Sequence, residues 1–399
     1  MLHQTRAARW ARASRGARRE RHCDEDACAV HGQADPDPVE QSWDRLLRWS
    51  KLAYQREHES TSALSRASKV AVLGGGSFGT AMASMLAHNA PSIDVALVLR
   101  DADLMADINT RNRNSRYLPD HRLPQSVRAT TDIADGLHHC QYLVLALPVQ
   151  HSRNALHNFK NLIPPDLPIL SLSKGLEAHR CCMMTDIITS MLHPQQPVAV
   201  LSGPSFAVEL MDGKPTAVVA ASELEWLALE TQQLFASECL RVNTTSDVVG
   251  VELAGALKNV LAIAAGIVMG LGLGNNAHAA LVAQGVSEIR WLACQMGASQ
   301  STLSGLSGVG DIMLTCFVDL SRNRSVGVRL GRGESINDVL RSSHQLAEGV
   351  ATASCVVQLA EEYRVQVPVL TAVAKIVRGQ LSPRQAVEQI MSLPQVAEV

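Results

Sequence analysis

Aromatic residues are scarce in this chain of 399 residues, of which they form only 4%. Charged residues make up 19% and nearly balance, which leaves a formal net charge of −2. A dedicated nucleic-acid-binding protein normally carries a strongly basic domain, so we expect no nucleic-acid partner. Hydrophobic residues make up 46% of the chain, which is enough for a globular protein with two domains and a sizeable core.

The nine cysteines include no Cys-x-x-Cys pair. An odd number of cysteines, most of them in apolar surroundings, is typical of reduced thiols in a cytoplasmic protein, and we expect that location. Four His and Cys residues near the N-terminus could in principle bind a metal, but they lie in a polar segment with irregular spacing, so we predict no metal site. The four residues are His22, Cys23, Cys28 and His31.

Long apolar runs are also lacking. The most apolar segment, residues 251–270, holds one lysine, Lys258, and the apolar run after it, Val260–Leu273, has 14 residues. That is short of the ~18–20 residues that span a bilayer, so we expect no membrane span. A buried ammonium group without a partner is costly. Lys258 therefore either reaches solvent along its own stem from a surface helix or has a function.

Residues 1–68 differ from the rest of the chain. Seven arginines crowd residues 6–21, and acidic and His-rich sequence without sustained apolar periodicity follows. The segment has no apolar stretch of a secretory signal, whereas an Arg-rich, acid-poor start resembles a transit peptide. We favour a disordered extension or an overlong gene model, and non-specific contact with RNA or anionic lipid is a further alternative. Residues 38–57 are expected to form a short amphipathic helix.

From residue 69 onward, apolar strand patterns alternate with segments that can form helices. Such continuous apolar strands predict a parallel sheet covered on both faces. After residue 245 the strand signals stop, and the remainder, up to a helix at residues 381–392, is rich in Ala, Leu and Val. The six predicted strands lie in residues 70–73, 94–100, 141–148, 167–175, 196–205 and 215–221.

The stretch GGGSFG places Gly74, Gly76 and Gly79 in a G-x-G-x-x-G spacing between the first strand and a helix at about residues 78–88. The first glycine permits a tight turn, the second lets the backbone approach a pyrophosphate, and the third allows close packing of helix on strand. The helix N-terminus then offers N–H groups to the phosphates. We therefore predict an α/β protein with a Rossmann-type doubly wound parallel sheet that binds a dinucleotide (residues 69–245), followed by an all-α substrate and catalytic domain (residues 246–399).

The second predicted strand ends with Arg100, where this fold usually places an acidic residue for the ribose hydroxyls of NAD. An arginine at this position can pair with the 2′-phosphate of NADP. The alternative is that Arg100 only caps the strand in solvent. We favour NADP over NAD.

Three polar groups interrupt otherwise apolar sequence. Lys174 follows the fourth strand, at the edge where ligands bind in such sheets, and Lys258 and Asn259 lie on a helix. Each group alone could be structural, but together they suggest anion recognition and proton transfer, because desolvation lowers the pKa of a lysine and a nearby carboxylate orients it. The third group consists of Asp311, Thr315, Arg322, Asn323 and Arg324.

The motifs GGGSFGTAMA, RNSRYLP, LSKGLE, LSGPSFAVE, GALKNVLAIAAGI, DIMLTC, SRNR and AEGVATA occur in that order. From about residue 69 to near the C-terminus, the chain resembles the bacterial-type NAD(P)-dependent glycerol-3-phosphate dehydrogenases. The resemblance implies reversible reduction of dihydroxyacetone phosphate to sn-glycerol 3-phosphate, a phospholipid precursor. It also implies no metal and is compatible with a homodimer.

The resemblance assigns roles to individual residues. Lys258 would be the catalytic proton donor and acceptor at the substrate oxygen. Substrate binding falls to Lys174, Gly203, Ser205, Lys258, Asp311, Ser321, Arg322 and Asn323. Cofactor binding falls to Gly74, Gly76, Ser77, Phe78, Gly79, Arg100, Tyr117, Lys174, Ala207, Arg322, Leu346 and Glu348. The chain departs from the family pattern at His278 and Gln284, where basic residues are usual, and neither position carries an assigned role.

Two other function classes stay open. A two-domain dehydrogenase for a hydroxy acid or sugar acid also uses lysine and asparagine, but in a K-x-x-x-N spacing and without the SGPSF and SRNR motifs. A non-catalytic dinucleotide sensor is expected to keep the glycines and lose the lysines and the arginine.

Overall fold

The computed structural model describes residues 38–57, 63, 67–342 and 347–394. The chain divides into two compact units, residues 1–60 and 61–399. In the first unit, helix α1 spans Pro38–Glu57, which confirms the helix predicted there. The Arg-rich start and the imagined metal ligands His22, Cys23, Cys28 and His31 lie outside the described residues.

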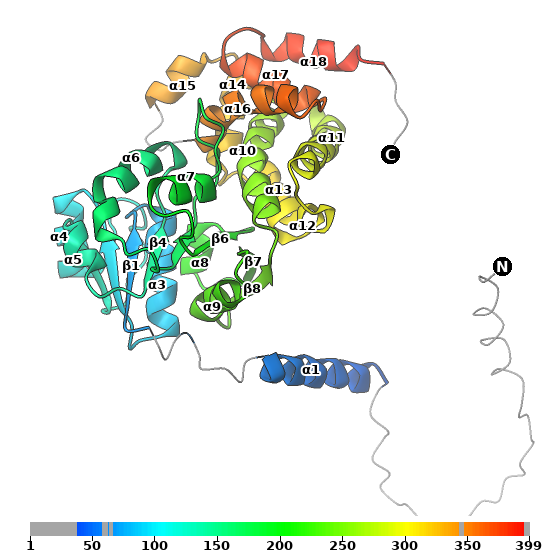
Figure 1. Ribbon diagram of the computed structural model, residues 1–399. Helices are drawn as coiled ribbons and strands as arrows, with labels where there is room; N and C mark the ends of the chain where they lie inside the picture. Colours follow the sequence, from blue (N-terminus) through cyan, green and yellow to red (C-terminus); the bar gives the residue numbers. More distant parts are fainter. Residues whose placement is uncertain (1–37, 58–62, 64–66, 343–346, 395–399) are drawn as a thin grey trace, which may run out of the picture. The chain divides into compact units, whose positions relative to one another are not determined.

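The described part of the second unit contains one eight-stranded sheet with the order β3-β2-β1-β4-β5-β6-β7-β8 (Figure 1). Neighbouring strands are parallel except β6 and β7, which are antiparallel. The doubly wound α/β fold predicted from the sequence is confirmed, with this one reversal. The strands are β1 Lys69–Leu73, β2 Asp94–Val98, β3 Val127–Thr130, β4 Tyr142–Leu145, β5 Ile169–Ser171, β6 Val198–Ser202, β7 Thr216–Ala221 and β8 Leu240–Thr245.

Two strands were not predicted, β3 and β8. Both lie at the edges of the sheet, and buried residues alternate with exposed or half-exposed ones along each of them. An edge strand that is covered on one face has apolar residues only at alternate positions. It therefore lacks the continuous apolar run from which the central strands were predicted.

The sheet is covered by helices on both faces. Along β1, Val70 and Val72 belong to a core with α3, α4, α8 and α9, whereas Ala71 and Leu73 belong to a core with α5, α6 and α7. This alternation follows from the two-residue period of a strand. The helices are α3 Ser77–Asn89, α4 Ala102–Arg111, α5 Ile133–Leu137, α6 Val149–Phe159, α7 Met184–Met191, α8 Ala207–Met211 and α9 Glu225–Phe235, with a 3₁₀ turn, η1, at Lys160–Leu162.

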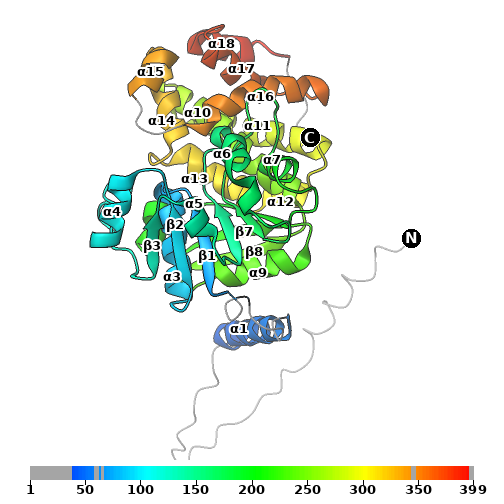
Figure 2. The same cartoon turned by 60° about the vertical axis from the view of Figure 1, so that its left-hand side comes forward.

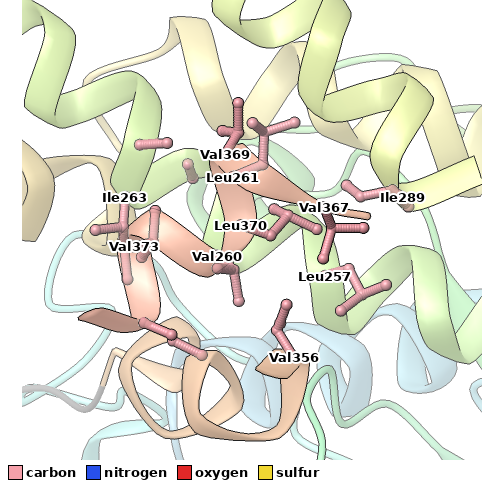
Figure 3. Close-up of a cluster of buried hydrophobic side chains, with 14 of the residues drawn as sticks. Leu257, Val260, Leu261, Ile263, Ile289, Val356, Val367, Val369, Leu370 and Val373 are labelled. Carbon is pink, nitrogen blue, oxygen red and sulfur yellow. The ribbon is translucent and has the colours of Figure 1, made fainter. Parts of the chain in front are cut away.

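From α10 onward the described elements are all helical and lie together beyond one end of the sheet (Figure 1, Figure 2). Helix α10 packs with α11, α13, α14, α16 and α17. Figure 3 shows its Leu257, Val260 and Leu261 among side chains of later helices. The helices are α10 Val248–Gly270, α11 Gly274–Gln295, α12 Gln300–Ser304, the π-helical turn η2 Leu306–Gly310, α13 Asp311–Phe317, α14 Arg322–Gly331, α15 Ile336–Ser342, α16 Glu348–Glu362, α17 Pro368–Val377 and α18 Pro383–Met391.

Helix α10 is the one described helix that is long and apolar enough to cross a membrane, and 89% of its apolar window is buried within the protein. It is therefore the core helix of this region. The burial leaves little room for Lys258 to reach solvent: its side chain is only 8% exposed. The surface-helix alternative for this lysine is wrong.

Glycines bring α10 and α14 into backbone contact. A Cβ atom at Gly266 would lie 2.1 Å from the carbonyl oxygen of Arg324, and one at Gly327 would lie 2.0 Å from that of Ile263. One turn further along, Gly270 and Gly331 meet the facing backbone in the same way. No side chain fits between the helices at these points, so the C-terminal part of α10 packs directly on the backbone of α14.

Candidate active site

The glycine loop between β1 and α3 has the conformation that a dinucleotide site requires. Gly74 has φ +125°, which favours glycine. A Cβ at Gly79 would lie 2.1 Å from the Gly74 carbonyl oxygen, whereas a Cβ at Gly76 would meet no protein atom within 4 Å. Gly76 is also the N-cap of α3, and no side chain caps this helix. Open space beside uncapped N–H groups fits a pyrophosphate.

Asn114 stabilises this loop, although it was not among the predicted site residues. Its fully buried side chain donates to the Gly75 carbonyl oxygen at 3.0 Å and to Thr80 Oγ1 at 2.8 Å. Its own Oδ1 accepts the Tyr117 N–H at 3.1 Å. The RNSRYLP motif therefore places half-buried Tyr117 beside the loop.

At the far end of β2, Arg100 is exposed. The next residue, Asp101, is the N-cap of α4 and accepts the Leu104 N–H at 3.0 Å. Its second oxygen lies 2.5 Å from a guanidinium nitrogen of Arg116. Asp101 is thus occupied by protein groups, whereas exposed Arg100 forms no ion pair with any residue of the described part of the chain.

A buried charge cluster lies where α10 meets α13. Lys258 Nζ donates to Asp311 Oδ1 at 2.7 Å and to Thr315 Oγ1 at 2.8 Å. Lys174 Nζ, from the loop after β5, donates to Asp311 Oδ2 at 2.9 Å and to the Gly203 carbonyl oxygen at 2.8 Å. One carboxylate therefore joins two lysines that are far apart in the sequence.

Burial and charge act in opposite directions within this cluster. Desolvation lowers the pKa of Lys258 from 10.5 to about 8, although Asp311 raises it. Desolvation would raise the pKa of Asp311, but the ammonium groups of Lys174 and Lys258 outweigh it and hold that pKa below its usual range. Lys258 can therefore gain or lose a proton close to neutral pH.

A chain of amides links this cluster to α14 and α16. Asn259 Nδ2 donates to the Lys174 carbonyl oxygen at 3.3 Å, and Asn323 Nδ2 donates to Asn259 Oδ1 at 2.9 Å. Asn323 Oδ1 in turn accepts the Gly349 N–H at 3.0 Å. Lys258 and Asn259 are adjacent in α10 but have different contacts. Lys258 belongs to the charge cluster, whereas Asn259 hydrogen-bonds to the loop after β5 and to α14.

Other predicted residues lie around the cluster. Ser321 is the buried N-cap of α14, and Arg322, its first residue, is exposed and interacts electrostatically with Glu348. Glu348 Oε1 accepts the Val149 N–H at 3.2 Å. Its buried Oε2 has no hydrogen-bond partner in the described part of the chain, and burial raises the pKa of this carboxyl group.

The remaining predicted residues lie in the loop after β6 and at the starts of α8 and α3. Gly203 has φ +147°, and Ser205 Oγ donates to its carbonyl oxygen at 3.0 Å. Ala207 begins α8. Ser77 begins α3, and the ring of Phe78 has its centroid 6.0 Å from Lys174 Nζ. Leu346 lies outside the described residues.

Hydrogen bonds thus connect Lys174, Lys258, Asp311, Gly203 and Asn323 in one network. Thr315, for which a polar stretch but no binding role was predicted, belongs to it as well. Its hydroxyl also donates to the Asp311 carbonyl oxygen at 2.7 Å. The spacing Asp311 to Thr315, one helical turn, was a usable signal.

Comparison with known proteins covers most of the chain. Residues 69–228 match the N-terminal family model of NAD-dependent glycerol-3-phosphate dehydrogenase, and residues 247–388 match the C-terminal one. A crystal structure of glycerol-3-phosphate dehydrogenase from Coxiella burnetii is 34% identical, with a TM-score of 0.77 over 82% of this chain and 99% of that one.

Relatives come from plants and bacteria. The chain is 55% identical over 359 residues to glycerol-3-phosphate dehydrogenase [NAD(+)] 2, chloroplastic, of Arabidopsis thaliana, which covers 90% of this chain and 85% of that protein. It is 43% identical over 325 residues to glycerol-3-phosphate dehydrogenase [NAD(P)+] of Oleidesulfovibrio alaskensis, which covers 81% and 98%.

These comparisons correct one expectation and establish the family. The expected cytoplasmic location is wrong, because the plant relative at 55% identity is a chloroplastic protein. The expectation rested on reduced cysteines, which are equally compatible with the interior of an organelle. The two family models and the identities above show that the chain belongs to the NAD-dependent glycerol-3-phosphate dehydrogenases, which are oxidoreductases.

Proposed function

We propose that the enzyme reversibly reduces dihydroxyacetone phosphate to sn-glycerol 3-phosphate and so supplies glycerophospholipid synthesis. Residues 69–245 bind the dinucleotide, and residues 246–399 carry the substrate and catalytic groups. The observation that carries the proposal is Lys258, a buried lysine whose ammonium group is held by Asp311 and Thr315. The cofactor, when bound, supplies the hydride.

Lys258 protonates the substrate oxygen during reduction and removes the proton during oxidation. A pKa of about 8 suits both directions close to neutral pH. Asp311 orients the ammonium group of Lys258 and stabilises its positive charge, which offsets part of the cost of burial. Lys174, on the other carboxylate oxygen, supplies a second positive charge for the oxygen and phosphate of the substrate.

The substrate phosphate binds at the start of α14. Arg322 offers a guanidinium fork, which matches phosphate oxygens, and the first turn of the helix adds N–H groups. Asn323 lies beside Arg322 and is fixed through Asn259. Gly203 and Ser205 line the opposite side of the substrate, next to Lys174.

The dinucleotide lies over the glycine loop, with Gly74, Gly76, Ser77, Phe78 and Gly79 around the phosphates. Tyr117, Ala207, Leu346, Arg322 and Glu348 complete its site. We propose NADP as the preferred form, on the strength of exposed Arg100 at the end of β2. The plant relative is named for NAD(+) and the bacterial one for NAD(P)+, so a comparison of the two cofactors is the direct test.

We also propose that the protein acts in a plastid. The plant relative at 55% identity is chloroplastic, and the Arg-rich, acid-poor start of the sequence resembles a transit peptide. Fusion of residues 1–68 to a fluorescent protein is expected to direct that protein into chloroplasts, and fluorescence confined to the cytosol would contradict the proposal. A homodimer is proposed by family resemblance alone, and sedimentation would test it.

The reaction is tested by the loss of nicotinamide absorbance with dihydroxyacetone phosphate. Lys258→Met keeps most of the side-chain volume and removes the proton, so turnover is expected to fall at least about 10²-fold. NADPH binding, followed by protein fluorescence, is expected to stay nearly intact. A variant with near-normal turnover would refute the role of Lys258. A wild type that binds NADPH and reduces no dihydroxyacetone phosphate would refute the substrate.

A further inference from the structure

Two adjacent residues after β2 have side chains that would favour different cofactors, one NAD and the other NADP. An acidic residue there accepts hydrogen bonds from the ribose hydroxyls of NAD and repels the 2′-phosphate of NADP, whereas an arginine attracts that phosphate. This chain has both, Arg100 and Asp101. The order of the two residues does not by itself say which one meets the cofactor.

The structure shows what occupies Asp101. One carboxylate oxygen accepts the Leu104 N–H at 3.0 Å, and the other lies 2.5 Å from Arg116 Nη1. The Leu104 N–H and the Arg116 guanidinium lower the pKa of Asp101 against the opposing effect of burial. The carboxylate therefore stays ionised, and its charge is directed at Arg116.

Arg116 is in turn held close to the cofactor loop. It lies between Asn114, which donates to the Gly75 carbonyl oxygen, and Tyr117, whose N–H bonds to Asn114. The side chain of Tyr117 also interacts with the Arg116 guanidinium. The position of Arg116 is thus tied to the glycine loop.

We propose that Arg116 is a positioning residue for cofactor selectivity. By pairing with Asp101 it prevents this carboxylate from binding the ribose of NAD and neutralises its repulsion of a 2′-phosphate. Arg100 is then the charged group that meets the adenosine ribose, and NADP is favoured. The inference rests on the proposed function insofar as Arg100 contacts the cofactor, and it does not depend on which substrate is reduced.

The test measures dissociation constants of the full chain for NADPH and NADH by fluorescence, together with kcat/KM for both cofactors. Arg116→Ala releases Asp101, so the preference for NADPH over NADH is expected to fall at least about threefold. In an Asp101→Asn background the same change is expected to leave the preference within about twofold, because Arg116 acts through Asp101.

Arg113→Ala is the matched control, since it removes an exposed arginine of the same loop for which the described residues show no ion pair with Asp101. It is expected to leave the preference unchanged, and thermal unfolding checks the fold of each variant. An unchanged preference in Arg116→Ala, or an equal fall in both backgrounds, would overturn the inference. Failure to reduce dihydroxyacetone phosphate would refute the proposed reaction instead, and the dissociation constants would still decide the role of Arg116.

Discussion

Replacing Asp311 by asparagine tests how the active site sets the proton affinity of Lys258. The carboxylate of Asp311 is 1% exposed and accepts from both Lys258 and Lys174. Asparagine offers one acceptor oxygen and turns an amide N–H₂ group towards one of the two ammonium groups. The variant also leaves two positive charges in a buried site without their shared counter-charge.

The size of the effect follows from the pKa of Lys258, which is about 8. At pH 7 this lysine is charged in a ratio of roughly ten to one. An opposite charge at this distance changes a pKa by about one to three units. With a shift of about two units, the ratio at pH 7 inverts to roughly one to ten.

Reduction needs protonated Lys258, so the wild-type kcat/KM for dihydroxyacetone phosphate is expected to fall as the pH rises through about 8. In Asp311→Asn this fall is expected about two pH units lower. Oxidation of glycerol 3-phosphate needs the neutral lysine, so its kcat/KM is expected to rise through the same pH values. The measurement that decides is the pH at which each kcat/KM falls or rises, because its absolute value also reflects weaker substrate binding by the variant.

Removal of one partner from a buried ion pair costs about 3–5 kcal/mol, so a lower but cooperative melting transition is expected. Lys258→Met is the control, since it should abolish this dependence of kcat/KM on pH. If kcat/KM of Asp311→Asn still falls near pH 8, the proposed role of Asp311 is refuted, because Asp311 would then not determine the pKa of Lys258.

The remaining predictions concern the glycine loop and a second buried carboxylate. Gly79→Ala forces a Cβ within 2.1 Å of the Gly74 carbonyl oxygen, so it is expected to lower the melting temperature. Gly76→Ala meets no protein atom and is expected to keep the melting temperature while raising the KM for the cofactor, and equal melting temperatures in both variants would contradict this contrast. Glu288 accepts the N–H groups of Val369 and Leu370, and burial raises its pKa from 4.5 to about 7. Its folded pKa lies above the unfolded one, so stability is lost as the pH rises from about 4.5 to about 7, by on the order of 3 kcal/mol at most. Glu288→Gln is expected to reduce the difference in melting temperature between pH 5 and pH 8, and an unchanged difference would show that other groups cause it.

The central strands could be predicted because they are buried on both faces and leave continuous apolar runs, as in β1 and β4. The reversal of β7 could not, because strand direction depends on how the connection through α8 crosses the sheet. A run such as Thr216–Ala221 reads the same in either orientation.

In the candidate site, the sequence indicated Lys258 and its carboxylate partner because a lysine is conspicuous within an apolar helix. The amide chain from Asn259 to Asn323 and Gly349 could not be predicted. These contacts join residues 64 and 26 positions apart, and only the packing of α10, α14 and α16 brings them within reach. Asn114 was missed for a related reason, since its burial depends on the loop that it braces.

The glycine contacts between α10 and α14 have a consequence for how selectivity can change in this enzyme. Gly266 and Gly270 of α10 meet the backbone of α14 directly, so the spacing of the two helices cannot be changed by exchanging a side chain at these contacts. Lys258 and Arg322 lie on these two helices, so the distance between the proposed proton donor and the proposed phosphate-binding arginine depends in part on this main-chain packing. We expect laboratory evolution towards longer phosphorylated ketones to find its solutions in the loops after β5 and β6, where Lys174 and Gly203 lie.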